Sequence, residues 1–167
     1  MKTVASSALA MLLNFERALA FCTFAVMLAA LIADVVGREL FGQGVFGSVR
    51  VAVYALILCA LAGFGIATGT GGHLRPRFLD GVLAGPVETA GIRAGQVVSV
   101  LILLMLAKAS WDVASFSREI GDRDVTLGWL VWPMQVSMPI AFSLSALRHM
   151  AYAVWPDLSP IESESIE

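Results

Sequence analysis

Residues 51–72 read VAVYALILCALAGFGIATGTGG, a run of 22 residues without a single charged side chain. A helix of about 20 residues crosses the ~30 Å hydrocarbon core of a bilayer at 1.5 Å per residue. The run is too long and too continuous for the short alternating strands of a membrane barrel. It therefore predicts a transmembrane helix and places the chain in the all-α integral membrane class.

Three other apolar segments have a similar length. The segment at 92–111 is the weakest of the four, because Arg93 and Lys108 lie at its ends. We expect both of these side chains to reach the headgroups along their aliphatic stems. Tryptophans near the predicted ends fit the membrane interface; they are Trp111, Trp129, Trp132 and Trp155. The sequence thus predicts four transmembrane helices, at residues 18–36, 51–72, 92–111 and 127–147.

The four spans are expected to form one domain over residues 1–156. We read residues 1–17 as an interfacial lead-in to the first span and not as a cleaved signal, because Glu16 and Arg17 lead directly into it. Residues 157–167 are expected to be an acidic, disordered tail. Between the second and third spans, four apolar residues at helical spacing predict a short amphipathic interfacial helix; they are Phe78, Leu79, Val82 and Leu83.

Composition agrees with a membrane protein. Of the 167 residues, 58% are hydrophobic and only 14% are charged, whereas soluble domains carry about 25% charged residues. The mean hydropathy is +0.81. The net charge of −2 and the lack of a Lys/Arg run argue against nucleic acid as a partner. The two cysteines, Cys22 and Cys59, lie in apolar runs and are expected to be unpaired, small buried side chains.

The predicted topology has both termini on one side. That side, with the second loop, holds six Lys and Arg residues, and the other side holds five. The positive-inside rule therefore favours cytoplasmic termini by a small margin.

No pattern in the sequence predicts an enzyme. The two histidines, His73 and His149, fall at span ends, whereas a haem would need facing axial ligands inside the membrane. No Cys/His spacing indicates zinc, and no glycine motif has the strand–turn–helix setting of a nucleotide site. We therefore expect no catalytic residue, cofactor or metal.

Two patterns leave alternatives open. Asp34 and Arg38 lie four residues apart on one helical face, so they form either an interfacial ion pair or part of an ion or proton site. Gly65 and Gly69, like Gly91 and Gly95, have the G-x-x-x-G spacing that lets another helix approach closely. That helix could belong to this chain or to a partner.

The order of these features resembles the small membrane subunit of tripartite ATP-independent periplasmic (TRAP) transporters, the DctQ-like family, over about residues 14–150. Glu16 opens the first span, and residues 34–42 (DVVGRELFG) resemble the family's Val-x-x-Arg-aromatic-x-Phe-Gly ending. Gly72-His73-Leu74 is similar to its Gly-His-Ile cytoplasmic turn. Met138-Pro139-Ile140 resembles its Ile-Pro step, with Arg148 near the end of the fourth span.

The chain also departs from this family. Residues 46–50 (FGSVR) stand where relatives often have Trp-x-Glu-Glu, and Pro76-Arg77 replaces a Val-Asp. Any contact that those acids make in relatives is in doubt here.

The resemblance implies a non-catalytic subunit in a bacterial or archaeal inner membrane. It would pair with a large multi-span subunit that holds the substrate and sodium sites, while a periplasmic binding protein delivers an organic anion, often a carboxylate. The small subunit would enlarge the static scaffold. The loops at 37–50 and 112–126 would face the periplasm and help dock the binding protein. The candidate contact residues are Asp34, Arg38, His73, Arg75, Arg118 and Arg123.

Two other functions compete with this one. A stand-alone four-span carrier or channel would transport a solute without other chains, and a membrane redox subunit would show a haem or quinone spectrum. The residues that choose the substrate would lie on other chains.

Overall fold

The computed structural model describes residues 2–71, 86–155 and 158. Within these residues the chain is helical, with one isolated antiparallel bridge between Arg123 and Leu130 and no strand. The all-α class is therefore confirmed. The helices are α1 (Lys2–Phe41), α2 (Ser48–Thr70), α3 (Pro86–Glu119), α4 (Trp132–Gln135) and α5 (Ser137–Val154).

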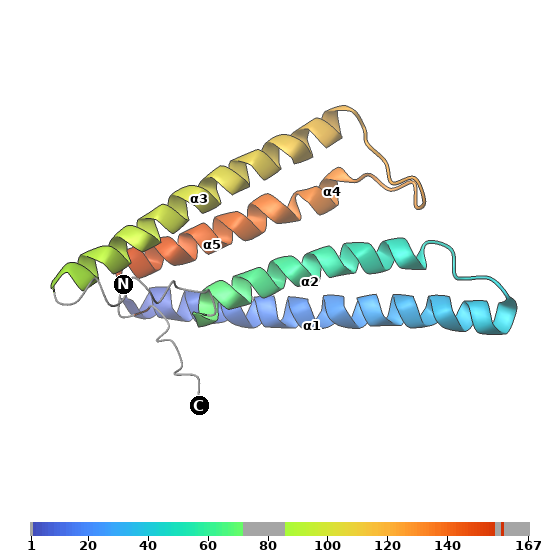
Figure 1. The fold of residues 1–167 in the computed structure, drawn as a ribbon, viewed down its shortest axis with the longest axis horizontal. Coiled ribbons are helices and arrows are strands. Elements are labelled where there is room, and N and C mark those ends of the chain that lie inside the picture. The colour runs from blue at the N-terminus through green and yellow to red at the C-terminus, as the bar shows by residue number, and fades with distance from the viewer. Residues whose placement is uncertain (1, 72–85, 156–157, 159–167) are drawn as a thin grey trace.

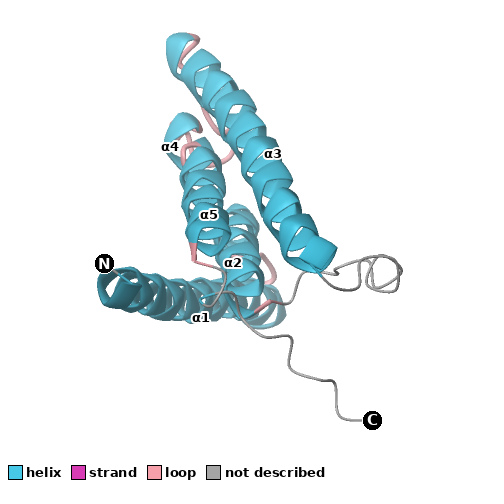
Figure 2. Ribbon diagram, turned by 90° about the vertical axis from the view of Figure 1, so that its left-hand side faces the viewer, coloured by secondary structure: helices cyan, strands magenta, loops and turns pink. Residues whose placement is uncertain are grey.

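The helices form an open row and not a closed bundle. α1 and α3 run in one direction, and α2 and α5 return (Figure 1). The main contacts join α1 to α2, α2 to α5, and α5 to α3, so α1 and α3 are the two edges of the row (Figure 2). We call the end where α1 begins and α5 finishes the near end. The far end holds the two connections at 42–47 and 120–131.

Much of the apolar surface is left uncovered by this arrangement. Only 11% of the most apolar window of α1 and 17% of that of α3 are buried, against 28% for the central α2. Phe21 on α1 and Met105 on α3 are 74% and 73% exposed. An apolar surface of this extent is stable in contact with lipid or with another membrane protein. The chain is therefore a membrane protein.

Three helices are long and apolar enough to cross a membrane, counting only the described residues: Ala5–Phe41, Ser48–Thr70 and Ala94–Glu119. The first and third are longer than the predicted spans at 18–36 and 92–111. The predicted lead-in at 2–17 continues the first span as one helix. α3 continues eight residues past position 111, across an i,i+4 ion pair between Lys108 and Asp112 at 3.0 Å. The far connection is consequently 120–131, and not 112–126.

The predicted fourth span corresponds to α4 and α5, which start at Trp132 and end at Val154, with an interruption at Val136. The cause lies in Pro139, which has no N–H to offer the carbonyl of Gln135 four residues earlier. Neither helix is among the three that qualify as spans by length and composition. A fourth span stays a prediction. The amphipathic helix and the acidic tail fall almost entirely outside the described residues.

Two glycines in the left-handed region fix the ends of α2. Gly47 precedes it with φ 78°, and Gly71 follows it with φ 74° while donating its N–H to the carbonyl of Ala67. Side chains other than glycine rarely adopt this conformation without strain. Both turns that lead into and out of the central helix are therefore set by the sequence.

Candidate functional site

A buried ion pair links the first and last helices near one end of the row. Arg148 of α5 donates from Nη2 to Glu16 Oε2 of α1 at 2.8 Å and from Nη1 to the carbonyl of Gly65 in α2. Its side chain is 1% exposed, and that of Glu16 is 8% exposed. One guanidinium thus links α5 to both α1 and α2.

Glycines in α2 make room for this pair. A Cβ at Gly65 would fall well inside the contact distance of the Glu16 carboxylate. One at Gly69 would lie 3.1 Å from Arg148 Nη1 and 3.0 Å from Leu13 Cδ1. The Gly65-x-x-x-Gly69 spacing therefore serves a close approach inside this chain, which is one of the two alternatives that the sequence left open.

A second polar contact lies beside the pair. His149 Nδ1 meets Gln96 Oε1 of α3 in a part-buried hydrogen bond. Since His149 follows Arg148 directly, this contact brings the remaining edge helix to the same level. We call the group formed by Glu16, Gln96, Arg148 and His149 the near polar layer.

Asp34 and Arg38 meet at the far end. The Arg38 guanidinium lies 2.7 Å from Asp34 Oδ2, and the Ser48 hydroxyl donates to Asp34 Oδ1 at 2.9 Å. Asp34 and Ser48 are buried, whereas the Arg38 side chain is 63% exposed. A Cβ at Gly44 would press on the Asp34 carboxylate. The pair therefore closes the turn between α1 and α2.

Asp124 fastens the far connection to α2. It accepts from the Tyr54 hydroxyl at 2.8 Å and from the backbone N–H groups of Thr126 and Leu127, each at 2.9 Å. Arg50 Nε lies 2.8 Å from its Oδ2. The pKa of Asp124 lies below its usual value, mainly because the Leu127 N–H donates to its carboxylate. The Tyr54 hydroxyl, the Thr126 N–H and the Arg50 charge lower this pKa further, while burial acts in the opposite direction. We call Asp34, Arg38, Ser48, Arg50 and Asp124 the far polar layer.

We expect Asp124→Asn to loosen the far connection at neutral pH. A carboxyl whose pKa is lowered by folding stabilises the fold above its unfolded pKa and loses that effect as the pH falls through the folded pKa. The difference in thermal unfolding between wild type and Asp124→Asn in detergent should thus be constant from pH 7 to about pH 5. It should shrink only below the ordinary Asp pKa of 3.8. A difference that vanished above pH 5 would contradict the assignment.

The two polar layers lie one membrane thickness apart. Eighteen residues of the continuous helix α1 separate Glu16 from Asp34, which is about 27 Å at 1.5 Å per residue. The hydrocarbon core of a bilayer is about 30 Å thick. The described charged groups at these two levels are thus spaced as the two boundaries of a membrane would require.

The other predicted contact residues are dispersed. Arg118 and Arg123 are exposed at the far end, with Arg118 Cζ 5.4 Å from the centroid of the Trp132 ring and Arg123 Nη1 donating to the Gly128 carbonyl at 3.0 Å. His73 and Arg75 lie outside the described residues. Gly95 faces open space, because a Cβ there would meet nothing within 4 Å.

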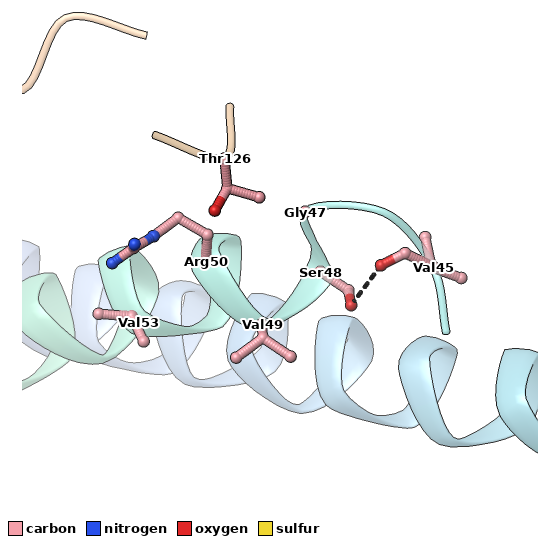
Figure 3. A pocket seen from close by; sticks show the side chains of 7 residues that line it. All are labelled: Val45, Gly47, Ser48, Val49, Arg50, Val53 and Thr126. Atoms are coloured by element: carbon pink, nitrogen blue, oxygen red, sulfur yellow. Dashed lines mark hydrogen bonds between the residues drawn. The ribbon is translucent and has the colours of Figure 1, made fainter. Parts of the chain in front are cut away.

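A shallow hollow of about 350 Å³ opens at the far end between the start of α2 and the far connection. Figure 3 shows Thr126 of the far connection next to Arg50 at the start of α2. Three of its seven lining residues are valine, and its one charged residue, Arg50, is already paired with Asp124. The full lining is Val45, Gly47, Ser48, Val49, Arg50, Val53 and Thr126. This lining does not gather the convergent polar groups of a small-molecule site.

The two buried polar side-chain atoms that lack a hydrogen bond in the described residues do not form a second site. Gln135 Oε1 and Ser145 Oγ have no hydrogen-bond partner among the described residues, and ten positions separate them along the chain. No group of three or more His, Cys, Asp or Glu side chains in the described ranges is placed to hold a metal ion.

The sequence pointed to Glu16 and Arg148 separately but did not predict that they form a pair. It also did not predict the contacts of Ser48, Tyr54 and Asp124. One signal could have found the first pair. Opposite charges stand at the near-side ends of the first and fourth predicted spans, and the predicted topology puts both at one membrane face. The Asp124 contacts had no such signal, because they depend on how a loop folds over α2.

The comparison with known families supports a transport component. Residues 17–158 match the family described as "Tripartite ATP-independent periplasmic transporters, DctQ component". The match includes Arg148 and the whole far polar layer, and it starts one residue after Glu16. No curated protein matches the chain at a significant level.

Proposed function

We propose that this chain, which belongs to the DctQ component family of the tripartite ATP-independent periplasmic transporters, is the non-catalytic small membrane subunit that widens the static scaffold of such a transporter. The family is a transporter component and not an enzyme. The large multi-span subunit would hold the substrate and sodium sites. A periplasmic binding protein would deliver the substrate, an organic anion and most simply a carboxylate.

One observation carries this proposal: each buried carboxylate and guanidinium of the described helices is paired with a group on its own or a neighbouring helix. Glu16 is paired with Arg148, and Asp34 with Arg38 and Ser48. Transport sites in membrane proteins usually combine broken helices and clustered polar groups near the midplane. Here the buried charged groups of the described helices lie at two levels, near the two ends of the row and not at its middle, which suits a rigid support.

The placement in the membrane follows from the polar layers. We place the near polar layer at the cytoplasmic boundary of the inner membrane and the far polar layer at the periplasmic boundary. α4 and α5 then complete a fourth crossing, with Arg148 sheltered by Glu16 and Gly65. The domain of residues 1–156 is one membrane unit, and the connections at 42–47 and 120–131 face the periplasm.

Copurification tests the proposal. The chain, carrying an affinity tag, is expressed with the large multi-span subunit of the same transporter, and the membranes are dissolved in mild detergent. We expect the large subunit to be retained in about equal amount, because a static scaffold shared by two chains requires their helices to stay packed together. A folded, tagged chain that retains no large subunit would refute the proposal.

We expect charge reversal in the last turn of α3 and in the far connection that follows it to weaken docking of the binding protein. Arg123→Glu and Arg118→Glu invert two exposed charges at the periplasmic end, and rim charges act mainly on association rates. Uptake at low binding-protein concentration should fall several-fold and should recover at high concentration. The matched control is Arg17→Glu, the same change at an exposed position of the near end. Equal uptake in all three variants would remove this loop from the docking surface.

A further inference from the structure

The two edges of the row differ in chemistry. The face of α1 that points away from α2 is apolar from residue 18 to residue 36. Its exposed members, at helical spacing, are Ala18, Phe21, Ala25, Leu28, Ile32 and Val36. A face of this kind suits contact with lipid chains. The face of α3 opposite α5 starts in the same way, with Ala94, Val98, Leu101 and Met105, and then presents Lys108 and Asp112.

These two charges are exposed and lie within the apolar stretch of the chain. The Lys108 side chain is 78% exposed and that of Asp112 is 61% exposed, and they are joined by a 3.0 Å ion pair. Twelve residues separate Lys108 from Gln96 of the near polar layer, about 18 Å along the helix. Lys108 is therefore about 9 Å short of the level of the far polar layer. A charged side chain at this depth is costly in hydrocarbon and normally faces protein or water.

The same edge also offers room for a close helix. Gly95 is exposed, and a Cβ there would meet nothing within 4 Å. Ala109, one turn before Val113 on this edge, is exposed as well. Small residues at such positions let a neighbouring backbone approach, and polar groups beside them hydrogen-bond across the contact. The α1 edge has small residues too, but no polar group among its exposed positions from 18 to 36.

We propose that the α3 edge is the face that contacts the large transport subunit and that the α1 edge faces lipid. The inference rests on the proposed function. The occupant is a transmembrane helix of the large subunit that packs against Gly95 and Ala109. It presents an acceptor to Lys108 and a donor to Asp112, so that neither charge of the pair meets hydrocarbon.

Tryptophan scanning in the copurification assay tests this. Gly95→Trp and Ala109→Trp place a large side chain on the α3 edge, and Ala25→Trp and Ala29→Trp do the same on the α1 edge. All four positions are exposed in the isolated chain, so each variant should keep its own fold, as checked by thermal unfolding. We expect the α3 variants to retain about tenfold less large subunit, and the α1 variants to retain wild-type amounts.

The outcomes separate the two proposals. Loss only with the α1 variants, or retention with all four, would overturn the choice of edge while leaving the proposed function intact. Failure of the wild-type chain to retain the large subunit would instead refute the proposed function. A charge-reversed Lys108→Asp, Asp112→Lys double variant adds a readout of chemistry. The double variant should retain less large subunit if a helix of that subunit pairs with both charges. An unchanged amount of retained large subunit would place the pair in the lipid headgroups.

Discussion

Replacing Arg148 with alanine should destabilise the folded chain by about 3–5 kcal/mol, the cost of breaking a buried ion pair and leaving one partner uncompensated. Glu16 would be left without its partner in a site that is 8% exposed, and the Gly65 carbonyl would lose its donor. The polar link at the near end between the α1–α2 and α3–α5 halves would be lost, whereas the packing of α2 against α5 would remain. We expect this to be among the largest effects of any single substitution in the described helices.

Thermal or denaturant unfolding in detergent measures the effect. Arg38→Ala is the matched control, since it removes the same kind of side chain from an ion pair whose arginine is 63% exposed. Solvent screens a pair whose arginine is this exposed, and Ser48 still donates to Asp34 in the variant, so we expect the smaller effect there. The double variant Glu16→Gln, Arg148→Gln should lose less than Arg148→Ala, because it leaves no unpaired buried charge. If Arg148→Ala and Arg38→Ala had equal effects, the near polar layer would not hold the helices together.

Gly65→Ala should be the second most damaging change, although it adds a single methyl group. Its Cβ would overlap the Glu16 carboxylate, which Arg148 holds in place from the other side. Overpacking of a filled interior costs about 1–3 kcal/mol. Gly63→Ala is the control two residues away on the same helix, where a Cβ would meet nothing within 4 Å.

The sign of the two effects should differ. Alanine favours a helix by up to about 1 kcal/mol over glycine, so Gly63→Ala should be neutral or stabilising while Gly65→Ala destabilises. Both are measured by unfolding in the same detergent. A stabilising Gly65→Ala would mean that the Glu16 carboxylate lies elsewhere and that the close approach of α1 to α2 is not needed.

The fold class follows from single segments, and for that reason it was predictable. The uncharged run at 51–72 needs only its own length and composition to be identified as a membrane helix, and α2 covers nearly the same residues. Helix ends were less predictable. α3 runs to Glu119 because Lys108 and Asp112, joined by an i,i+4 ion pair, do not interrupt a helix, whereas hydropathy detects only apolar segments.

The polar layers depend on contacts between distant segments. Asp34 and Arg38 could be paired from the sequence because an i,i+4 spacing is local. Glu16 and Arg148 are 132 positions apart, so their pairing requires the order of the helices in the row. That order is set by packing between helices, which no single helix encodes. The break at Val136 has a local cause in the sequence, because Pro139 removes one backbone N–H from the helix, and the interruption lies about one turn before it.

Uptake by reconstituted vesicles tests the central claim most directly, namely that this chain supports a transporter but does not transport. Vesicles that contain the purified chain alone should take up no more labelled organic anion than empty vesicles, under a sodium gradient and with the binding protein present. Vesicles that also contain the large subunit should accumulate it, and those with the large subunit alone should accumulate far less. Uptake by the chain on its own would contradict the account.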